Sequence, residues 1–226
     1  MHWEPKKGIG PTFIGTCFAY RRQGHFITAA HCLGDLQADQ LGVMTPQRAL
    51  IKSAIALTRH PTADIAIIET PTVHVEGDVV EPFELIVSNW SLGEDFFAFG
   101  YPIDVLGPDP DKPTERLFKG HFQRFLDHKS QHLPFHYLAA ELSIASPTGL
   151  SGGPLFRPAA HTVLLGMATE NLTSTTSLES VEKLQRGEEV VEKHSHERVI
   201  EYGVALMLSG VSDWIDSHIP PTTTPA

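Results

Sequence analysis

The sequence lacks an excess of positive charge. Its 226 residues carry 27 acidic and 17 basic side chains, which gives a formal net charge of −10. Non-specific nucleic-acid binding depends on a basic surface that neutralises phosphates, so this balance argues against nucleic acid as a partner. The sequence also lacks a run of about 18 apolar residues, which a membrane-spanning helix needs. We therefore expect neither a nucleic-acid-binding protein nor a membrane protein.

Cysteine is scarce as well, because Cys17 and Cys32 are the only two. Two thiols cannot form the disulfide framework of a small secreted domain, and without clustered partners they do not indicate a zinc site. We expect no metal and no cofactor. The first eight residues lack the charged-then-apolar layout of a secretory signal. This start predicts a cytoplasmic protein or the processed form of an exported one.

Short apolar runs, separated by Gly, Pro, Asn and Asp, dominate the rest of the sequence. Most are five to ten residues long and rich in β-branched or aromatic residues, which predicts strands of an all-β sandwich or barrel. The runs cover residues 13–20, 25–29, 49–57, 64–69, 95–100, 117–126, 135–144, 163–169 and 202–208.

A change in composition near residues 88–94 predicts a boundary between two β lobes, 1–92 and 93–219. Helical spacing of apolar residues appears only at 211–219, so we expect one short C-terminal helix there. The following Pro- and Thr-rich tail, 220–226, is expected to be loose.

Residues 172–201 form a polar and acidic insertion within the second lobe. Leu178, Val181 and Leu184 have the spacing of a short helix within it. A solvated acidic face is one interpretation of the insertion. The other is a lid that overhangs a substrate pocket.

Three local motifs carry the candidate chemistry. His31 lies in Thr28-Ala-Ala-His-Cys32, directly after an apolar run, and Asp64 opens a second apolar run. Ser151 lies in the sequence Gly-Leu-Ser-Gly-Gly-Pro. Each motif alone is common without catalysis, because such residues also serve as core histidines, turn formers and tight turns. The three together, in this order, predict a Ser-His-Asp triad.

These residue types fit the needs of amide hydrolysis. A serine hydroxyl is a weak nucleophile, so an imidazole must take its proton as it attacks. A buried carboxylate such as Asp64 would hold that imidazole in the correct tautomer. The glycines beside Ser151 let the backbone turn, so the N–H groups of Gly149 and Ser151 are the expected oxyanion donors.

The motifs resemble those of the trypsin-like (chymotrypsin-fold) serine peptidases, especially their bacterial branch. The resemblance covers almost the whole chain, because residues 15–20, 166–171 and 202–205 also match strands of the family. It implies two six-stranded antiparallel β-barrels with the active site in the cleft between them. His31 and Asp64 would come from the first barrel and Ser151 from the second.

The resemblance also implies a substrate pocket and marks departures from the family. Leu150 stands where members activated by cleavage have an aspartate, so activation by a new N-terminus is not expected. Ala145 stands at the pocket base where Arg- or Lys-cleaving members have an aspartate, so we expect an apolar P1 residue, small to medium if Asn171 narrows the entrance. (P1 is the substrate residue whose carbonyl is attacked.) The implied substrate-binding residues are Ala145, Thr169, Glu170, Asn171 and Gly203.

Two further features have alternative interpretations. The resemblance implies a disulfide between Cys17 and Cys32 if the protein is exported, and otherwise they are buried thiols. His128, His132 and His136 recur every four residues, which on a helix would be a metal-binding face. The break at Pro134 favours a hairpin that leads into a strand instead.

The sequence thus predicts a serine endopeptidase that acts on proteins or peptides through an acyl-enzyme. We expect its activity to rise with pH through an apparent pKa of about 6–7, the range of an unperturbed histidine base. Two alternatives remain: a catalytically silent peptide-binding module of the same fold, and an esterase.

Overall fold

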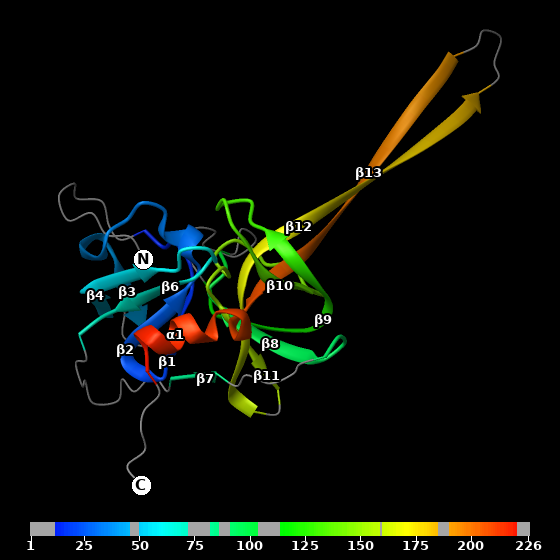
Figure 1. Cartoon of the computed structure of the whole chain (residues 1–226). Helices are drawn as coiled ribbons and strands as arrows, with labels where there is room; N and C mark the ends of the chain where they lie inside the picture. Colours follow the sequence, from blue (N-terminus) through cyan, green and yellow to red (C-terminus); the bar gives the residue numbers. More distant parts are fainter. Residues whose placement is uncertain are drawn as a thin grey trace.

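The computed structural model of the chain describes residues 12–45, 50–71, 82–85, 91–103, 114–158, 160–184 and 190–220. The described part consists almost entirely of strands and contains one α-helix, close to its C-terminal end (Figure 1). The predicted all-β fold with a short C-terminal helix is therefore confirmed.

The first half of the chain forms a four-stranded antiparallel sheet in the order β1-β2-β6-β5, beside a two-stranded sheet, β3-β4. The predicted run at 49–57 is divided between β4 and β5, with a turn between them. The strands are β1 (Cys17–Tyr20), β2 (Arg22–Thr28), β3 (Gly42–Thr45), β4 (Leu50–Ser53), β5 (Ala56–Arg59) and β6 (Ala66–Glu69).

The second half, which here means the strands from residue 84 onward, forms a seven-stranded sheet in the order β11-β8-β9-β10-β13-β12-β7, with a further pairing between β11 and β12. All of its pairs are antiparallel except β7 with β12. The strands are β7 (Glu84–Leu85), β8 (Asp95–Gly100), β9 (Arg116–Lys129), β10 (His136–Leu142), β11 (Pro154–Arg157), β12 (Ala160–Leu184) and β13 (Val190–Met207).

The two halves share one apolar core, which the C-terminal helix helps to close. This core joins Ile27 of β2 to Met167 of β12, and Ile215 of α1 (Ser212–His218) is fully buried in it. A 3-10 turn, Leu208–Val211, leads from β13 into the helix. In the described part of the chain, no helix is long and apolar enough to cross a membrane.

The insertion at 172–201 is a long hairpin, so the expected helix over Leu178–Leu184 is wrong. β12 and β13 stay paired without interruption from Asn171 with Gly203 to Leu184 with Val190. Ser and Thr crowd this part of β12, and β-branched threonines favour the pleated conformation over a helix. Both figures show the hairpin projecting away from the rest of the molecule, so it is not a lid over the site.

Candidate active site

His31 and Asp64 form the best-defined pair in the site. His31 lies in a 3-10 turn, Ala30–Leu33, just after β2, and Asp64 lies just before β6. The backbone N–H of His31 donates to Asp64 Oδ1 at 2.9 Å, and Nδ1 lies 2.7 Å from Oδ2. Asp64 is fully buried. Because a carboxylate only accepts, Nδ1 carries a proton, and in the neutral ring Nε2 is left as the acceptor.

The surroundings of His31 change the basicity of its ring. Burial by itself lowers the pKa, since it disfavours the charged imidazolium. The hydrogen bond to Asp64 and the contact with Cys32 outweigh burial and raise the pKa of His31 from 6.5 to about 10. The ring is therefore a stronger base than a free histidine.

Ser151 lies in the loop between β10 and β11, close to His31. The sulfur of Cys32 is 3.6 Å from His31 Nε2 and 3.9 Å from the Ser151 carbonyl oxygen, so both residues flank this one atom. The Ser151 hydroxyl donates to the carbonyl of Thr169 at 2.7 Å. Thr169 is fully buried, and its own hydroxyl donates to the carbonyl of Val204. The serine hydroxyl is thus bonded to the backbone of β12.

The loop before Ser151 presents two free donors. Among the described residues, the N–H groups of Gly149 and Ser151 have no hydrogen-bond acceptor. Gly149 has a φ of +93°, and a Cβ there would lie 2.7 Å from the Tyr101 carbonyl oxygen, so only glycine fits. The Thr16 hydroxyl donates to the Gly149 carbonyl at 2.7 Å, and the Thr16 N–H donates to the Ser151 carbonyl at 2.9 Å. Thr16 therefore fixes this loop at both ends.

Leu150 anchors the same loop by packing. Its side chain is fully buried in the core of the second half, in the cluster that contains Phe96 and Leu155. A Cβ on Gly100 would lie 2.8 Å from Leu150 Cδ1, so that glycine makes room for the leucine. An apolar contact therefore occupies the position at which the resemblance would place an ion pair.

Three residues of the implied substrate pocket lie close together. Asn171 bonds to both backbone groups of Ser146, and Gly203 donates its N–H to the Ile144 carbonyl at 2.7 Å. Ala145 is half-buried between these two contacts. Ala145, Asn171 and Gly203 are thus brought together.

Glu170 differs from its predicted place at the pocket edge, because it is buried in a polar network. Its Oε1 lies 2.8 Å from His128 Nε2 and accepts from the Tyr137 hydroxyl at 3.3 Å, while Oε2 accepts the N–H of Gln131 at 3.0 Å. Burial raises the pKa of Glu170, but the bonds from His128 and Gln131 outweigh it and lower the pKa from 4.5 to about 2. Glu170 therefore stays ionised and holds the β9–β10 loop against β12.

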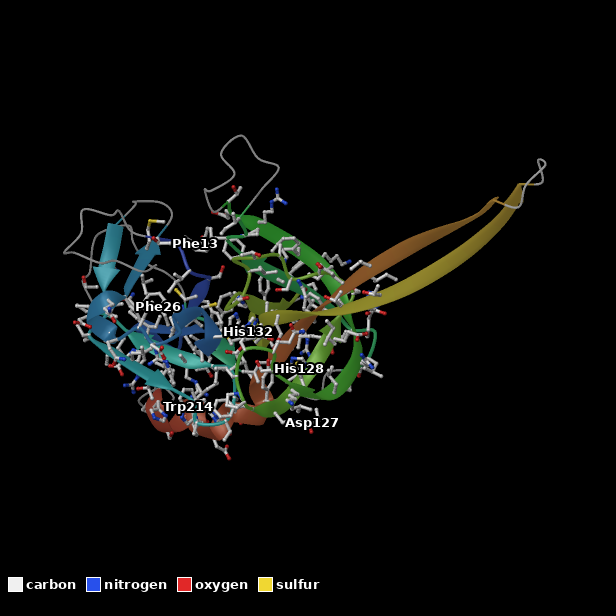
Figure 2. All side chains as sticks on the ribbon, turned by 90° about the horizontal axis from the view of Figure 1, so that it is seen from above. Phe13, Phe26, Asp127, His128, His132 and Trp214 are labelled. Atoms are coloured by element: carbon white, nitrogen blue, oxygen red, sulfur yellow. The ribbon has the colours of Figure 1, made fainter. Side chains whose placement is uncertain are left out.

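The three histidines spaced four residues apart have three different surroundings. His128 pairs with Glu170, whereas His136 is exposed on β10. The ring of His132 stacks on the ring of His31, with centroids 4.7 Å apart and planes at 21°. Figure 2 labels His128 and His132, which lie on the side of the second half that faces the first. No group of three metal-ligating side chains occurs in the described residues.

The disulfide implied by the resemblance is absent, because both cysteines are free thiols. A Cβ on Gly15 would lie 2.8 Å from the sulfur of Cys32. Gly15, just before β1, therefore faces Cys32, and Cys17 lies two residues further along the chain, at the start of β1. Cys17 and Cys32 instead both line a small space of about 20 Å³. Burial raises the pKa of the Cys17 thiol to about 11.

Sequence reasoning missed Thr16, Gln131 and His132 as parts of the site. Thr16 stands in the Gly-Thr-Cys-Phe segment that carried the resemblance, so its position was visible but its two bonds were not. The spacing of His132 suggested a metal ligand and gave no sign of stacking. The Gln131 side chain donates to the Asn171 carbonyl at 3.0 Å, and nothing in the sequence pattern signals this contact.

A family model, described as the trypsin-like peptidase domain, matches residues 15–167, which is more than half of the chain. The chain belongs to the trypsin-like peptidase family. The domain is that of a protease, in the hydrolase class, and its fold is the chymotrypsin β fold. No curated protein sequence matches this trypsin-like peptidase.

Several solved structures share the fold of this trypsin-like peptidase. The active form of the Rv3671c protease from M. tuberculosis is 16% identical, with a TM-score of 0.59 over 94% of this chain and 76% of that one. The MamO protease domain from Magnetospirillum magneticum is also 16% identical, with a TM-score of 0.55 over 94% and 90%. The scabies mite inactivated protease paralogue is 17% identical, with a TM-score of 0.57 over 89% and 86%. At these identities the likeness concerns the fold alone.

Proposed function

We propose that this trypsin-like peptidase is a serine endopeptidase that cleaves peptide bonds through an acyl-enzyme. Ser151 is the nucleophile, His31 the general base and Asp64 the carboxylate that orients His31. The observation that carries the proposal is the double hydrogen bond between His31 and Asp64, beside the Ser151 loop. It supports the tautomer in which Nε2 can take the serine proton.

The bond changes follow from these roles. Ser151 Oγ attacks the substrate carbonyl carbon while its proton passes to His31 Nε2. The resulting oxyanion is stabilised by the N–H groups of Gly149 and Ser151, which have no competing acceptor among the described residues. The C–N bond then breaks, and the departing amine takes the proton from His31. Water, deprotonated by His31, hydrolyses the ester and restores Ser151.

Substrate binding completes this geometry. In the free protein the Ser151 hydroxyl donates to the carbonyl of Thr169, so a rotation about its Cα–Cβ bond must bring Oγ to His31. A substrate backbone that pairs with residues 169–171 as an added strand would offer an N–H to this carbonyl and release the serine. The proposed substrate is a protein or peptide. Ala145 leaves the pocket base without a carboxylate, which favours an apolar P1 residue over arginine or lysine.

The orientation of Ser151 also favours a second candidate, a silent peptide-binding module. In such a module the hydroxyl would stay on Thr169 and the edge of β12 would bind peptides without cleavage. An esterase would use the same residues and differs only in its substrates.

A covalent probe separates these candidates. A serine-directed fluorophosphonate should label Ser151, and mass spectrometry of the digested protein should locate the label there. Ser151→Ala should neither be labelled nor cleave peptides, and Ser91→Ala, a change in a loop, serves as the matched control. Cleavage of a peptide library supports the endopeptidase, and hydrolysis of esters alone indicates an esterase. Peptide binding without label or cleavage would identify the silent module and overturn the proposal.

A further inference from the structure

Asn171 lies where the path of a substrate side chain would run. It is on β12, two residues beyond Thr169, whose carbonyl holds the Ser151 hydroxyl. Its cross-strand partner on β13 is Gly203. The loop segment that precedes Ser151 faces Asn171. The backbone N–H of Ser146 donates to the Asn171 side chain, and the Ser146 carbonyl accepts from it. In the proposed site, a substrate side chain beside Ser151 enters between β12 and this segment.

The Asn171 side chain spans that space. Its Oδ1 accepts the N–H of Ser146 at 2.6 Å, and its Nδ2 donates to the carbonyl of the same residue at 2.9 Å. A primary amide joined to both backbone groups of one residue has a single orientation, since turning the amide over would oppose donor to donor. The Asn171 side chain is therefore a fixed bridge, the Asn171 crossbar, between β12 and the segment that contains Ser146.

The strands and the loop segment beside the Asn171 crossbar are also held by hydrogen bonds. The N–H of Gly203 donates to the Ile144 carbonyl at 2.7 Å, and a Cβ on Gly203 would lie 2.7 Å from that oxygen. On the other side of β12, the Gln131 side chain donates to the Asn171 carbonyl at 3.0 Å. β13 is thus bonded to the segment that precedes Ser151, and β12 is bonded to the β9–β10 loop, so neither strand can move aside without breaking these bonds.

Opening the crossbar would leave buried polar groups without partners. Ser146 is 6% exposed, and its hydroxyl already has no hydrogen-bond partner in the described part of the chain. If Asn171 swung out, the N–H and the carbonyl of Ser146 would lose their bonds as well. An apolar substrate side chain cannot replace those bonds, so its binding would carry the full desolvation penalty.

We propose that Asn171 is a specificity-determining residue that closes the primary pocket and restricts P1 to glycine or alanine. The inference rests on the proposed peptidase function and narrows its substrate class from apolar residues in general to the two smallest. A hydrogen or a methyl group can lie beside Ser151 without displacing the crossbar. A longer side chain must break both bonds to Ser146.

The test compares peptides that differ only at P1, with Gly, Ala, Val, Leu or Phe. Native protein should cleave after Gly or Ala with a kcat/KM about 100-fold above that for Leu or Phe, because the larger residues leave buried groups unpaired. Asn171→Gly should bring the kcat/KM values of the five peptides to within about tenfold of one another, because it raises the values for Leu and Phe. Thr173→Gly, a change at an exposed site on the same strand, controls for the added backbone freedom. It should leave the ranking of the five peptides by kcat/KM as in the native protein.

A second measurement separates this inference from the proposed function. In the Ser151→Ala background no bond is cleaved, and the affinity for the same peptides is measured by calorimetry. Asn171→Gly should strengthen binding of the Leu and Phe peptides about tenfold or more and leave the Ala peptide within about threefold. This holds even if the native protein only binds peptides. The role of Asn171 would be overturned if the native protein cleaved or bound the Phe peptide as well as the Ala peptide. It would also be overturned if Asn171→Gly ranked the peptides as the native protein does in both assays.

Discussion

The ring of His132 lies flat against the ring of His31, with centroids 4.7 Å apart. His132 belongs to the loop between β9 and β10, and the neighbouring Gln131 bonds to the edge of β12. That loop is held down by Glu170, which accepts the Gln131 N–H. The free protein thus covers one face of His31 with its own side chain.

We predict that His132→Ala lowers KM for peptide substrates about 3–10-fold, with little change in kcat. A substrate must displace the stacked ring before it packs against His31, and such ring pairs contribute about 0.5–1.5 kcal/mol. Steady-state kinetics with one peptide measures the effect. His136→Ala, an exposed histidine at the start of β10, is the matched control. A rise in KM would show instead that His132 contacts the substrate.

The pH dependence of activity should reflect the bond between His31 and Asp64. Since that bond favours the imidazolium, more alkaline solution is needed to free Nε2 than for an ordinary histidine. We predict that kcat/KM rises with pH through an apparent pKa above the 6–7 expected from the sequence. Asp64→Asn should lower this pKa and reduce kcat about 10⁴-fold. A native profile already flat from pH 5 upwards would contradict the prediction.

The same bond links His31 to stability. Its pKa is raised in the folded state, so the stabilisation is fully present below pH 6.5 and is lost as pH rises towards about 10. Chemical unfolding of the native protein should show this decline across that window. Asp64→Asn should remove this decline in the free energy of unfolding. If the free energy fell equally with pH in the two proteins, the linkage would be ruled out.

Glu170→Gln should destabilise the protein by about 3 kcal/mol at pH 7, because it breaks a buried pair with His128. The pKa of Glu170 is depressed, so its contribution is present above pH 4.5 and is lost as pH falls towards about 2. Urea unfolding at several pH values measures the difference between the two proteins, which should shrink across this window. Glu201→Gln, an exposed change on β13, should have no such effect.

Leu150→Asp should both destabilise the fold and slow labelling of Ser151. An unpaired carboxylate in the cluster of Phe96 and Leu155 would cost several kcal/mol, of order 3–5. The loop that carries Gly149 and Ser151 would lose its anchor. Leu150→Met keeps the volume and should cost less than about 1.5 kcal/mol. Thermal melting and the rate of fluorophosphonate labelling measure the two effects, and a variant that melts and labels like the native protein would disprove the anchoring role.

Much of the local structure could be read from the sequence. The predicted run at 95–100 is β8 itself, and most other runs lie within or overlap an observed strand. The contact between His31 and a buried Asp64 was also expected, because both residues border apolar strands. Within the hairpin at 172–201, the short helix expected over Leu178–Leu184 was wrong. There, three apolar residues at helical spacing gave a signal that the β-branched threonines and the pairing with β13 outweighed.

The sequence by itself determined which chemical groups the protein has and the strands that carry them, because period, turn residues and burial pattern are local properties of the chain. Only the tertiary structure decided what those groups face. The packing of distant segments bonds Asn171 to Ser146 and stacks His132 on His31. It also bonds the Ser151 hydroxyl to Thr169 and places Gly15, rather than Cys17, opposite Cys32. Each contact joins residues from different strands or loops, where packing of the whole core fixes the approach to a fraction of an ångström. No local pattern encodes such a distance.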